Sequence, residues 1–567
     1  MAKSPNREAT MRRTLARRLL ATLATATLAV GVTAGCGDDG DSSADAEGKI
    51  INVLSGTNAG FVPNFNPFSQ NSVAGTMSVL YESLLYFNAA RADDVQPQLA
   101  TGYEFADDGR RLNLTIREGV KWTDGKPFSA EDVAFTFNLI RDNPKLNQNG
   151  LPIVEAVATD PTHVSVTFSQ GVYTRLNLIA GRTWIVPKHI WSTIADPSAF
   201  TNEKPVGTGA FMLASFSQQN YVFERNPNYW ETGKPKIKGM RFQQFASADS
   251  AIAALAAGQL DWAGSFIADI EKQYVSKDPK HNKYINESQL YLTNLIPNLD
   301  RAPFDSAAVR KAISLALDRD QIIRLAFSGY GKEASPAQLP RPLWDDYIKP
   351  EHKDRKLEFD PARAEQTLQA DGWAKGADGI YAKAGRRLSF TVKVVQGYND
   401  YISALQIMTQ SLKSVGIEMK TQEVSFTAFS TDQQTGDFEM IITNLYSEGT
   451  AYSWYSRAFS SKRTAPLGQQ AGSNYGRFRN AAVDAALLAM ENTPPDQRDA
   501  IREQLFKIQD VIVEELPYIP LQQSASLIEY RTENLGNFPT EENHYALTTP
   551  YNGPDMGIVA KNLTPAG

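Results

Sequence analysis

The chain has a single cysteine, Cys36, and its position indicates the first chemistry that the residues can support. A lone cysteine closes no intramolecular disulfide. Residues 19–35 before it carry no charged side chain, and residues 1–18 carry six Lys and Arg against Glu8 alone. A basic segment, an apolar segment and then small residues are the pattern of a signal peptide. The apolar segment is shorter than the roughly 20 residues that span a bilayer, so we predict no permanent membrane helix here.

The segment TAGC, residues 33–36, resembles a lipobox, in which a diacylglycerol is attached to the cysteine thiol and the chain is cut before it. Two acyl chains on an N-terminal cysteine anchor a protein stably. We therefore predict that residues 1–35 are a lipoprotein signal peptide and that Cys36 is the lipid anchor. Residues 36–48 have no large apolar side chain, which predicts a disordered tether. The alternative is a free thiol beside an ordinary secretory cleavage site.

The other reactive side chains form no recognised catalytic or metal-binding motif. The five histidines include no close pair, which does not favour a transition-metal site. The sequence contains no GxSxG, HExxH or GxxxxGK[ST] motif. Adjacent carboxylates such as Glu514 and Glu515 fit a solvated helix face. We therefore expect no enzyme activity, no metal and no cofactor, and a catalytic triad scattered along the chain is the alternative.

Composition limits the class of protein further. From residue 36 onward the chain carries 51 Lys and Arg against 62 Asp and Glu, a net charge of −11. Nucleic-acid-binding proteins usually show a basic stripe, so we expect no nucleic-acid partner. About 530 residues exceed the 250–300 at which a single hydrophobic core stops growing. We expect two or three lobes, stabilised by their cores rather than by disulfides.

The segments that would position functional residues are a mixture of strands and helices. Residues 49–56 read as a buried strand, and residues 111–116 alternate apolar and polar side chains as a half-exposed strand does. Ser129 followed by Asp132 predicts a capped helix start. Asp318 is placed to cap the second helix of a two-helix unit, and Pro517 ends a late amphipathic helix. Packing alone explains all of these segments.

Residues 99–133, LATGYEFADDGRRLNLTIREGVKWTDGKPFSAEDV, resemble the signature region of the family 5 extracytoplasmic solute-binding proteins. These proteins are the peptide, nickel and oligosaccharide receptors of ABC importers. The residues that carry the resemblance include Arg117, Gly119, Val120, Lys121, Trp122, Asp124, Gly125 and Pro127. The likeness continues in order through PVGTGAF (205–211), NPNYW (226–230), AALAAGQLDWA (253–263), FDSAAVRKAISLALDR (304–319) and ELPYIPL (515–521).

The resemblance implies an α/β, type II periplasmic-binding-protein clamshell of two lobes with an extra subdomain in the first lobe. It assigns residues 49–87, 201–293 and 526–567 to lobe I, residues 88–200 to the subdomain and residues 294–525 to lobe II. Ligands of such folds lie between the lobes, and a ligand that contacts both lobes favours the closed state. We expect a monomer outside the cell membrane, tethered through its N-terminal lipid, whose partners are the permease subunits of an ABC importer.

The resemblance implies an oligopeptide ligand first and an oligosaccharide second. Family members that bind peptides hold the free amine with an Asp, near whose position Ser447 and Glu448 stand here. Either Glu448 binds the amine or the ligand has none. The motif NFNPF, residues 64–68, resembles a loop of cello-oligosaccharide receptors, and tyrosine or tryptophan faces can stack on sugars. The candidate ligand-binding residues are Asn64, Phe65, Asn66, Phe68, Trp262, Gly264, Tyr446, Ser447, Glu448, Tyr452 and Trp454.

Each of these residues has a plainer interpretation. The two asparagines can simply shape a turn around Pro63 and Pro67, and aromatic residues at the spacing of Tyr452 and Trp454 often belong to a core. Nickel is the least favoured ligand, because the sequence shows no suitable set of His or Arg. A surface-anchored chaperone or signalling receptor with the same clamshell is a further alternative.

Overall fold

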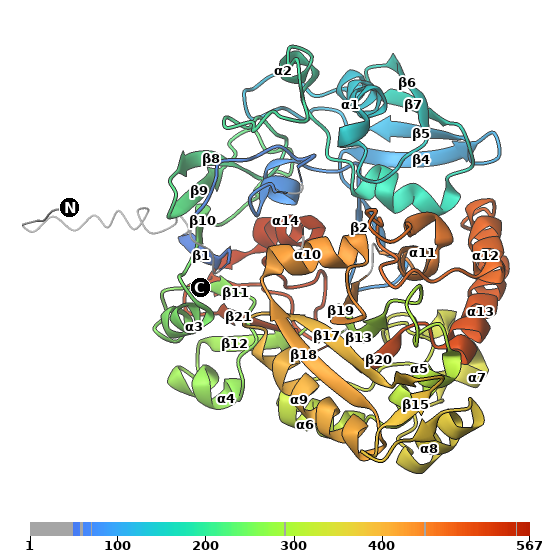
Figure 1. Ribbon diagram of the computed structural model, residues 1–567. Coiled ribbons are helices and arrows are strands. Elements are labelled where there is room, and N and C mark those ends of the chain that lie inside the picture. The colour runs from blue at the N-terminus through green and yellow to red at the C-terminus, as the bar shows by residue number, and fades with distance from the viewer. Residues whose placement is uncertain are drawn as a thin grey trace, which may run out of the picture. The chain divides into compact units, whose positions relative to one another are not determined.

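The computed structural model describes residues 49–56, 60–69, 71–288, 291–446, 449–524, 526–551 and 553–566 (Figure 1). The predicted signal peptide, Cys36 and the tether lie outside these residues. Glu47–Gly567 form one compact unit. Within the described ranges, no helix combines the length and the apolar character needed to cross a bilayer.

The first large sheet has seven strands, and we call the part built on it lobe I. Its strand β1 lies parallel to β10 on one side and to β11 on the other, and the remaining pairs are antiparallel. Ile51 and Val53 of β1 are fully buried, as the sequence predicts for this segment. The order is β12 (Asn282–Asn286), β21 (Leu527–Arg531), β11 (Trp262–Ala263), β1 (Ile50–Leu54), β10 (Gly239–Gln243), β9 (Asn220–Arg225) and β8 (Phe211–Phe216).

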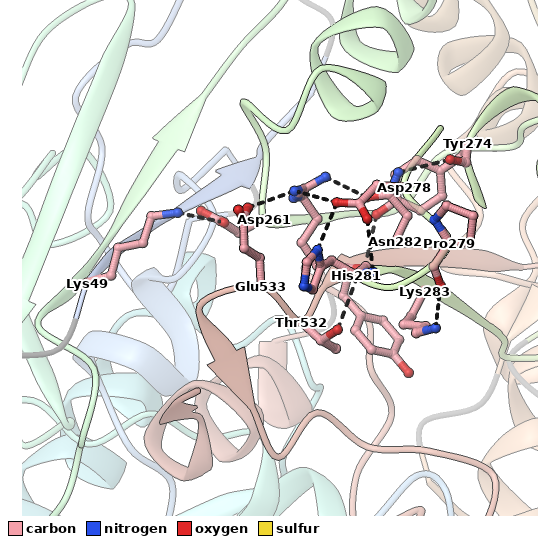
Figure 2. Close-up of polar contacts among 12 residues, drawn as sticks. Lys49, Asp261, Tyr274, Asp278, Pro279, His281, Asn282, Lys283, Thr532 and Glu533 are labelled. Atoms are coloured by element: carbon pink, nitrogen blue, oxygen red, sulfur yellow. Dashed lines mark hydrogen bonds and ion pairs between the residues drawn. The ribbon is translucent and has the colours of Figure 1, made fainter. Parts of the chain in front are cut away.

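Three helices belong to lobe I: α3 (Ala248–Ala256), α4 (Ile270–Gln273) and α14 (Gly553–Asn562). A polar network fixes the sheet at the edge formed by β12 and β21 (Figure 2). Asp278 pairs with His281 at 3.0 Å and with Arg531 at 3.1 Å, and Arg531 also donates to Asn282. Lys49, just before β1, pairs with Asp261 at 3.1 Å. These contacts hold together segments from both ends of the chain.

A four-stranded antiparallel sheet forms a separate subdomain in the order β4 (Ala100–Ala106), β5 (Arg111–Ile116), β7 (His163–Phe168) and β6 (Ile153–Asp160). It has its own hydrophobic cluster, and helix α1 (Ala130–Asp142) packs against it. The predicted cap is confirmed, because Ser129 accepts from the backbone N–H of Glu131 and its own N–H donates to Asp132. Helix α2 (Lys188–Trp191) and the hairpin β2 (Leu85–Phe87) with β3 (Val95–Pro97) complete this region.

The second large sheet has five strands, and we call the part built on it lobe II. Its order is β18 (Glu418–Val424), β17 (Ser389–Val395), β19 (Met440–Tyr446), β13 (Tyr291–Pro297) and β20 (Ile519–Gln523). Both faces are buried: Met440 and Ile442 belong to one hydrophobic cluster and Ile441 to another. A small sheet of β14 (Ala374–Lys375), β15 (Tyr381–Lys383) and β16 (Arg386–Arg387) accompanies it, and β22 (Leu535–Gly536) pairs with β23 (Thr564–Pro565) near the C-terminus.

Helices from two parts of lobe II cover the two faces of its sheet. The first cluster includes residues of α5 (Ala307–Leu315), α6 (Arg319–Ala326), α8 (Pro361–Ala370) and α9 (Asn399–Ser414). The second includes residues of α10 (Phe426–Thr435), α11 (Ala451–Phe459), α12 (Ala481–Glu491) and α13 (Arg498–Glu515), and α7 (Pro350–Lys353) lies near α13 (Figure 1). Asp318 caps α6 by accepting from the N–H of Gln321, and α13 ends before Pro517, as predicted.

The chain passes between the two large sheets twice. It leaves lobe I at the end of β12 and enters lobe II at Tyr291, and it returns between Gln523 and Leu527. On each side of these passages the two strands pair with each other, β12 with β21 and β13 with β20. The prediction of an α/β protein with two lobes and an extra subdomain is therefore confirmed.

Candidate ligand-binding site

The loop of residues 61–69 is built into the core of lobe I. Phe65 is fully buried and lies edge-on to Phe216 and Tyr221, and Phe68 packs against Trp191. The Asn66 amide donates to the carbonyls of Pro197 and Phe200 and accepts from the N–H of Phe68. The Asn64 amide donates to Ser69 and accepts from the N–H of Asn66. These contacts favour the turn-shaping interpretation for Asn64, Phe65, Asn66 and Phe68.

The end of strand β11 lies closer to the passage between the lobes. Trp262 is fully buried, and its indole N–H donates to the carbonyl of Thr548 at 2.6 Å, so it holds the C-terminal segment. Gly264 lines a cavity. A Cβ atom at Gly264 would lie 2.5 Å from the ring of Tyr551, so this approach requires glycine. Of the two predicted residues, only Gly264 lies at the cavity wall.

This cavity, which we call the interlobe cavity, has a volume of about 170 Å³ and walls from both lobes. Lobe I supplies the β11 end and the C-terminal segment, and lobe II supplies strands β13, β19 and β20 and the start of helix α9. Its lining residues are Gly264, Ser265, Phe266, Ser526, Leu527 and Tyr551 on one side, and Tyr291, Thr293, Phe327, Asp400, Tyr401, Asn444, Gln522 and Ser524 on the other. The Tyr291 hydroxyl donates to that of Tyr551 at 3.2 Å across the passage.

A larger hollow of about 500 Å³ in lobe I adjoins the interlobe cavity, because Tyr551 lines both. Its wall includes Ser55 after β1, the segment 71–75 and Gln244 after β10. The carboxyl ends of the parallel strands β1 and β10 therefore face this hollow. Sites of α/β proteins commonly lie at such strand ends.

Hydrogen bonds fix the polar wall of the interlobe cavity. The side-chain oxygen of Asn444 accepts from the hydroxyls of Thr293 at 2.9 Å and Tyr401 at 2.7 Å. This arrangement leaves the amide N–H₂ of Asn444 as a donor for a ligand. Glu529, fully buried behind the wall, accepts from the N–H of Ser265 at 3.1 Å, and burial raises the pKa of its carboxyl well above the usual value.

Asp400 is the one Asp, Glu, Lys, Arg or His among the residues that line the interlobe cavity. It lies in the first turn of α9, partly buried, and the structure shows no ion pair for it within the described residues. Burial raises the pKa of its carboxyl, and the backbone N–H groups of Tyr401 and Asp400 partly oppose the rise. An ionised Asp400 therefore lacks the countercharge that would compensate its lost hydration.

The end of strand β19 carries the remaining predicted residues. Tyr446 is 45% exposed, and the Arg457 guanidinium lies over its ring at 4.2 Å. Ser447 and Glu448 lie outside the described residues. Tyr452 is buried, and its hydroxyl donates to Glu491 at 2.6 Å at the wall of a different cavity. Trp454 is 1% exposed within a hydrophobic cluster of lobe II, which favours the core interpretation for this residue.

Comparison with known proteins decides the family. Residues 94–466 match the family described as bacterial extracellular solute-binding proteins, family 5 Middle. The chain belongs to this family. The resemblance proposed from the sequence is thereby confirmed, and this family 5 solute-binding protein is the substrate-binding component of an ABC importer. Members of the family are extracytoplasmic binding proteins, not enzymes.

Individual relatives of this solute-binding protein agree over most of its length. The oligopeptide-binding protein AppA of Bacillus subtilis is 26% identical over 454 residues, which cover 77% of this chain and 80% of AppA. The glutathione-binding protein GsiB of Salmonella paratyphi A is 25% identical over 502 residues, which cover 84% of this chain and 90% of GsiB.

A solved structure confirms the predicted fold of the family 5 protein. The periplasmic oligopeptide-binding protein of an oligopeptide ABC transporter from Thermotoga maritima matches with a TM-score of 0.83 at 24% identity, over 91% of this chain and 99% of that chain. The mannohexaose-bound structure of the same protein matches with a TM-score of 0.78 at 25% identity, over 91% and 98%. The chain therefore has the type II periplasmic-binding-protein fold.

Among the described residues of this solute-binding protein, one group could place three ligand atoms around a metal: Glu351, His352 and Asp510. The Lys349 ammonium lies 2.8 Å from Asp510 and 3.0 Å from Glu351. An ammonium group at this distance already supplies the positive charge that the carboxylates require. The cluster is therefore explained as an ion-pair network on lobe II.

Apart from Gly264, the candidate residues taken from the sequence do not include those that line the interlobe cavity of this protein. Tyr291, Asp400 and Tyr551 come from a strand, a helix start and a C-terminal loop that are far apart in the sequence. No local motif links them. The available signal was the Gly-Tyr-Asn-Asp stretch at 397–400, which places a carboxylate five residues after the apolar segment that forms strand β17.

Proposed function

We propose that this protein captures oligopeptides between its two lobes and delivers them to the permease subunits of its importer. The observation that carries the proposal is Asp400, the single ionic side chain that lines the interlobe cavity, with no cationic partner among the described residues. The similarity to AppA and GsiB, an oligopeptide-binding and a glutathione-binding protein, supports an amine-bearing peptide ligand.

A peptide α-ammonium supplies what this carboxylate lacks. It brings a positive charge and three N–H donors, and hydrogen bonds to charged groups are stronger than those between neutral groups. The rings of Tyr291, Tyr401 and Tyr551 around the cavity give the cation additional favourable surfaces. Contact with the ammonium would also lower the pKa of Asp400, which burial raises in the free protein. Peptide binding should therefore favour the ionised form of Asp400.

Glu448 was one of the two alternatives that the sequence left open for the amine, the other being a ligand without one, and it stands four residues beyond Asn444 in the sequence. The two carboxylates make different predictions for single variants. If Asp400 holds the amine, then Asp400→Asn removes the preference for a free N-terminus and Glu448→Gln preserves it. The opposite result would assign the amine to Glu448.

Isothermal titration calorimetry of the full-length protein with tri- to hexa-alanine, each with a free or an acetylated N-terminus, tests the proposal. We expect acetylation to weaken binding roughly tenfold to a hundredfold, the value of a hydrogen bond to a charged group. Asp400→Asn should weaken binding of the free peptides equally and make acetylation harmless. The matched control Asp320→Asn removes an exposed carboxylate of α6 and should bind as wild type. Equal binding of free and acetylated peptides by the wild type would refute the role of Asp400.

Oligosaccharide capture is the second candidate, and the specific observation for it is the aromatic lining of the interlobe cavity. Phe266, Tyr291, Phe327, Tyr401 and Tyr551 all line it, beside neutral amides and hydroxyls that can pair with sugar hydroxyls. The Thermotoga maritima protein has been crystallised with mannohexaose. Binding of mannohexaose or cellohexaose with no binding of any peptide would select this candidate.

We also propose that residues 1–35 are removed and that lipid on Cys36 holds a monomer at the outer face of the cell membrane. The basic, apolar and small-residue segments and the TAGC sequence support this proposal. Residues 36–48 would then separate the first strand, β1, from the membrane surface.

A further inference from the structure

A second cavity, which we call the outer cavity, lies between the subdomain of lobe I and lobe II. Its volume is about 230 Å³. The subdomain side consists of the β2–β3 hairpin and the turn at Tyr173–Arg175, and the lobe II side consists of the starts of α11 and α13 with the segment around Trp344. Because both lobes supply walls, a group bound here would contact both lobes.

Aromatic and aliphatic side chains dominate the interior of the outer cavity. Phe87, Tyr173 and Leu176 line it from the subdomain, and Trp344, Tyr452 and Leu505 line it from lobe II. An apolar cavity of roughly 150 Å³ is large enough to bind benzene. At about 230 Å³, the outer cavity can accept the side chain of a phenylalanine, tyrosine or leucine residue.

The carboxylates of this region already have partners. Asp93 accepts from the Tyr347 hydroxyl at 2.8 Å and lies 3.7 Å from the Arg498 guanidinium. Asp94 accepts from Asn88 at 2.8 Å. A ligand group in the outer cavity therefore needs no charge to balance these carboxylates, which favours a neutral side chain.

Two buried donors beside the outer cavity have no acceptor within the described residues. They are the indole N–H of Trp344, a residue that is 3% exposed, and the hydroxyl of Thr174. Buried donors in proteins nearly always have an acceptor.

The chain limits the distance between the two cavities. Asn444 lines the interlobe cavity and Gly449 lines the outer cavity, and the chain between them has four residues, which is five steps from one Cα atom to the next. Their Cα atoms are therefore at most about 18 Å apart, which is the length of about five residues of extended peptide. A peptide whose N-terminus lies in the interlobe cavity can thus reach the outer cavity with its fourth to sixth residue.

We propose that the outer cavity binds an apolar side chain, preferably aromatic, from the fourth to sixth residue of the captured peptide. The inference rests on the proposed peptide-binding function and adds a length and a side-chain requirement to it. A peptide that fills both cavities contacts lobe II at Asp400 and both lobes at the outer cavity. Such a peptide favours closure more strongly than a di- or tripeptide does.

The test uses hexa-alanine and six hexapeptides in which a single phenylalanine replaces each alanine in turn, titrated calorimetrically into the full-length protein. We expect phenylalanine at one position from four to six to tighten binding about tenfold or more, the value of burying an aromatic side chain. Ile501→Trp, on the α13 wall, fills the cavity and should reduce that gain, measured relative to hexa-alanine on the same variant, to less than twofold. The control Glu503→Trp adds the same side chain at an exposed position of α13 and should keep the gain.

A second measurement does not depend on the folding of a variant. The favoured phenylalanine is replaced by photoleucine, and we expect the cross-link to join the peptide to residues 449–452 or 493–505. Hexa-alanine binding shows that the proposed function holds, whatever the phenylalanine series gives. Equal affinity across that series, or cross-links only elsewhere, would overturn the outer-cavity assignment. Binding of free indole that persists beside saturating peptide would also overturn it, because the cavity would then be a separate small-molecule site.

Discussion

Asp555 should make the stability of this protein depend on pH in a way that one substitution can isolate. The residue lies in α14 and is 1% exposed. Its Oδ1 atom accepts from the Tyr86 hydroxyl at 2.7 Å and from the N–H of Leu547 at 3.1 Å, and its buried Oδ2 atom has no partner in the described part of the chain. Burial raises the pKa of Asp555 from 3.8 to about 6, although the hydrogen bond from Tyr86 opposes the rise.

Whether stability rises or falls with pH follows from the proton that the folded state retains. Below pH 3.8 the carboxyl is protonated in both the folded and the unfolded chain, so its titration does not change the free energy of unfolding. Between pH 3.8 and about 6 the unfolded chain loses the proton and the folded chain keeps it, so the free energy of unfolding falls. A difference of about two pKa units corresponds to about 3 kcal/mol, all of which is lost above pH 6.

Asp555→Asn keeps the Oδ1 atom that accepts hydrogen bonds and removes the carboxyl group that ionises. Urea denaturation of wild type and variant at half-unit steps from pH 4 to pH 7 gives two stability curves. Between pH 4 and pH 7, the free energy of unfolding of the variant minus that of the wild type should increase by about 2–3 kcal/mol. Asp249→Asn, at an exposed position of α3, controls for the removal of a negative charge. A pH-independent difference between wild type and Asp555→Asn would refute the reasoning.

Three further predictions concern packing, closure and anchoring. Trp454→Ala should lower the free energy of unfolding by about 3–5 kcal/mol while peptide affinity stays the same, and a binding defect at normal stability would contradict its place in the core. Asp93→Ala removes contacts to Tyr347 and Arg498 across the lobes, so small-angle scattering of the unliganded protein should show a larger radius of gyration; an unchanged curve would contradict a role in closure. Cys36→Ser should release the protein into the culture medium with normal affinity, and retention on cells would sink the lipid-anchor proposal.

The sequence predicted those parts of the fold that depend on local patterns. The strand at Ile50–Leu54, the alternating strand at Arg111–Ile116 and the caps at Ser129 and Asp318 all follow from residues close together in the chain. In each case the side chains that decide the structure lie within a few positions of each other. The order of strands within each sheet was not predicted, because strand pairing such as β11 with β21 joins residues far apart in sequence.

The candidate site was harder to predict, because residue type does not determine which way a side chain faces. An amide and an aromatic ring can serve a ligand or a core equally well. Asn66 has its amide fully used by backbone groups of lobe I, and Trp454 fills a hydrophobic cluster of lobe II. Asp400 has no neighbouring motif, and only the folded chain brings it to the wall shared with Tyr551.

The contacts between the lobes indicate how a ligand controls their closure. Asp93 and Arg498 form a largely exposed pair, and such pairs contribute at most about 1 kcal/mol. The Arg175 to Glu491 pair, at 3.7 Å, is more buried, and the hydrogen bonds of Tyr347 to Asp93 and of Tyr291 to Tyr551 also join the lobes. These contacts contribute to the balance between the closed and the open state of the free protein. A ligand shifts that balance by the difference between its affinities for the closed and the open state. If Asp400 of lobe II binds the ligand as proposed, that contact contributes affinity, and closure requires further contacts with lobe I residues that line the same cavity, such as Ser265 and Tyr551.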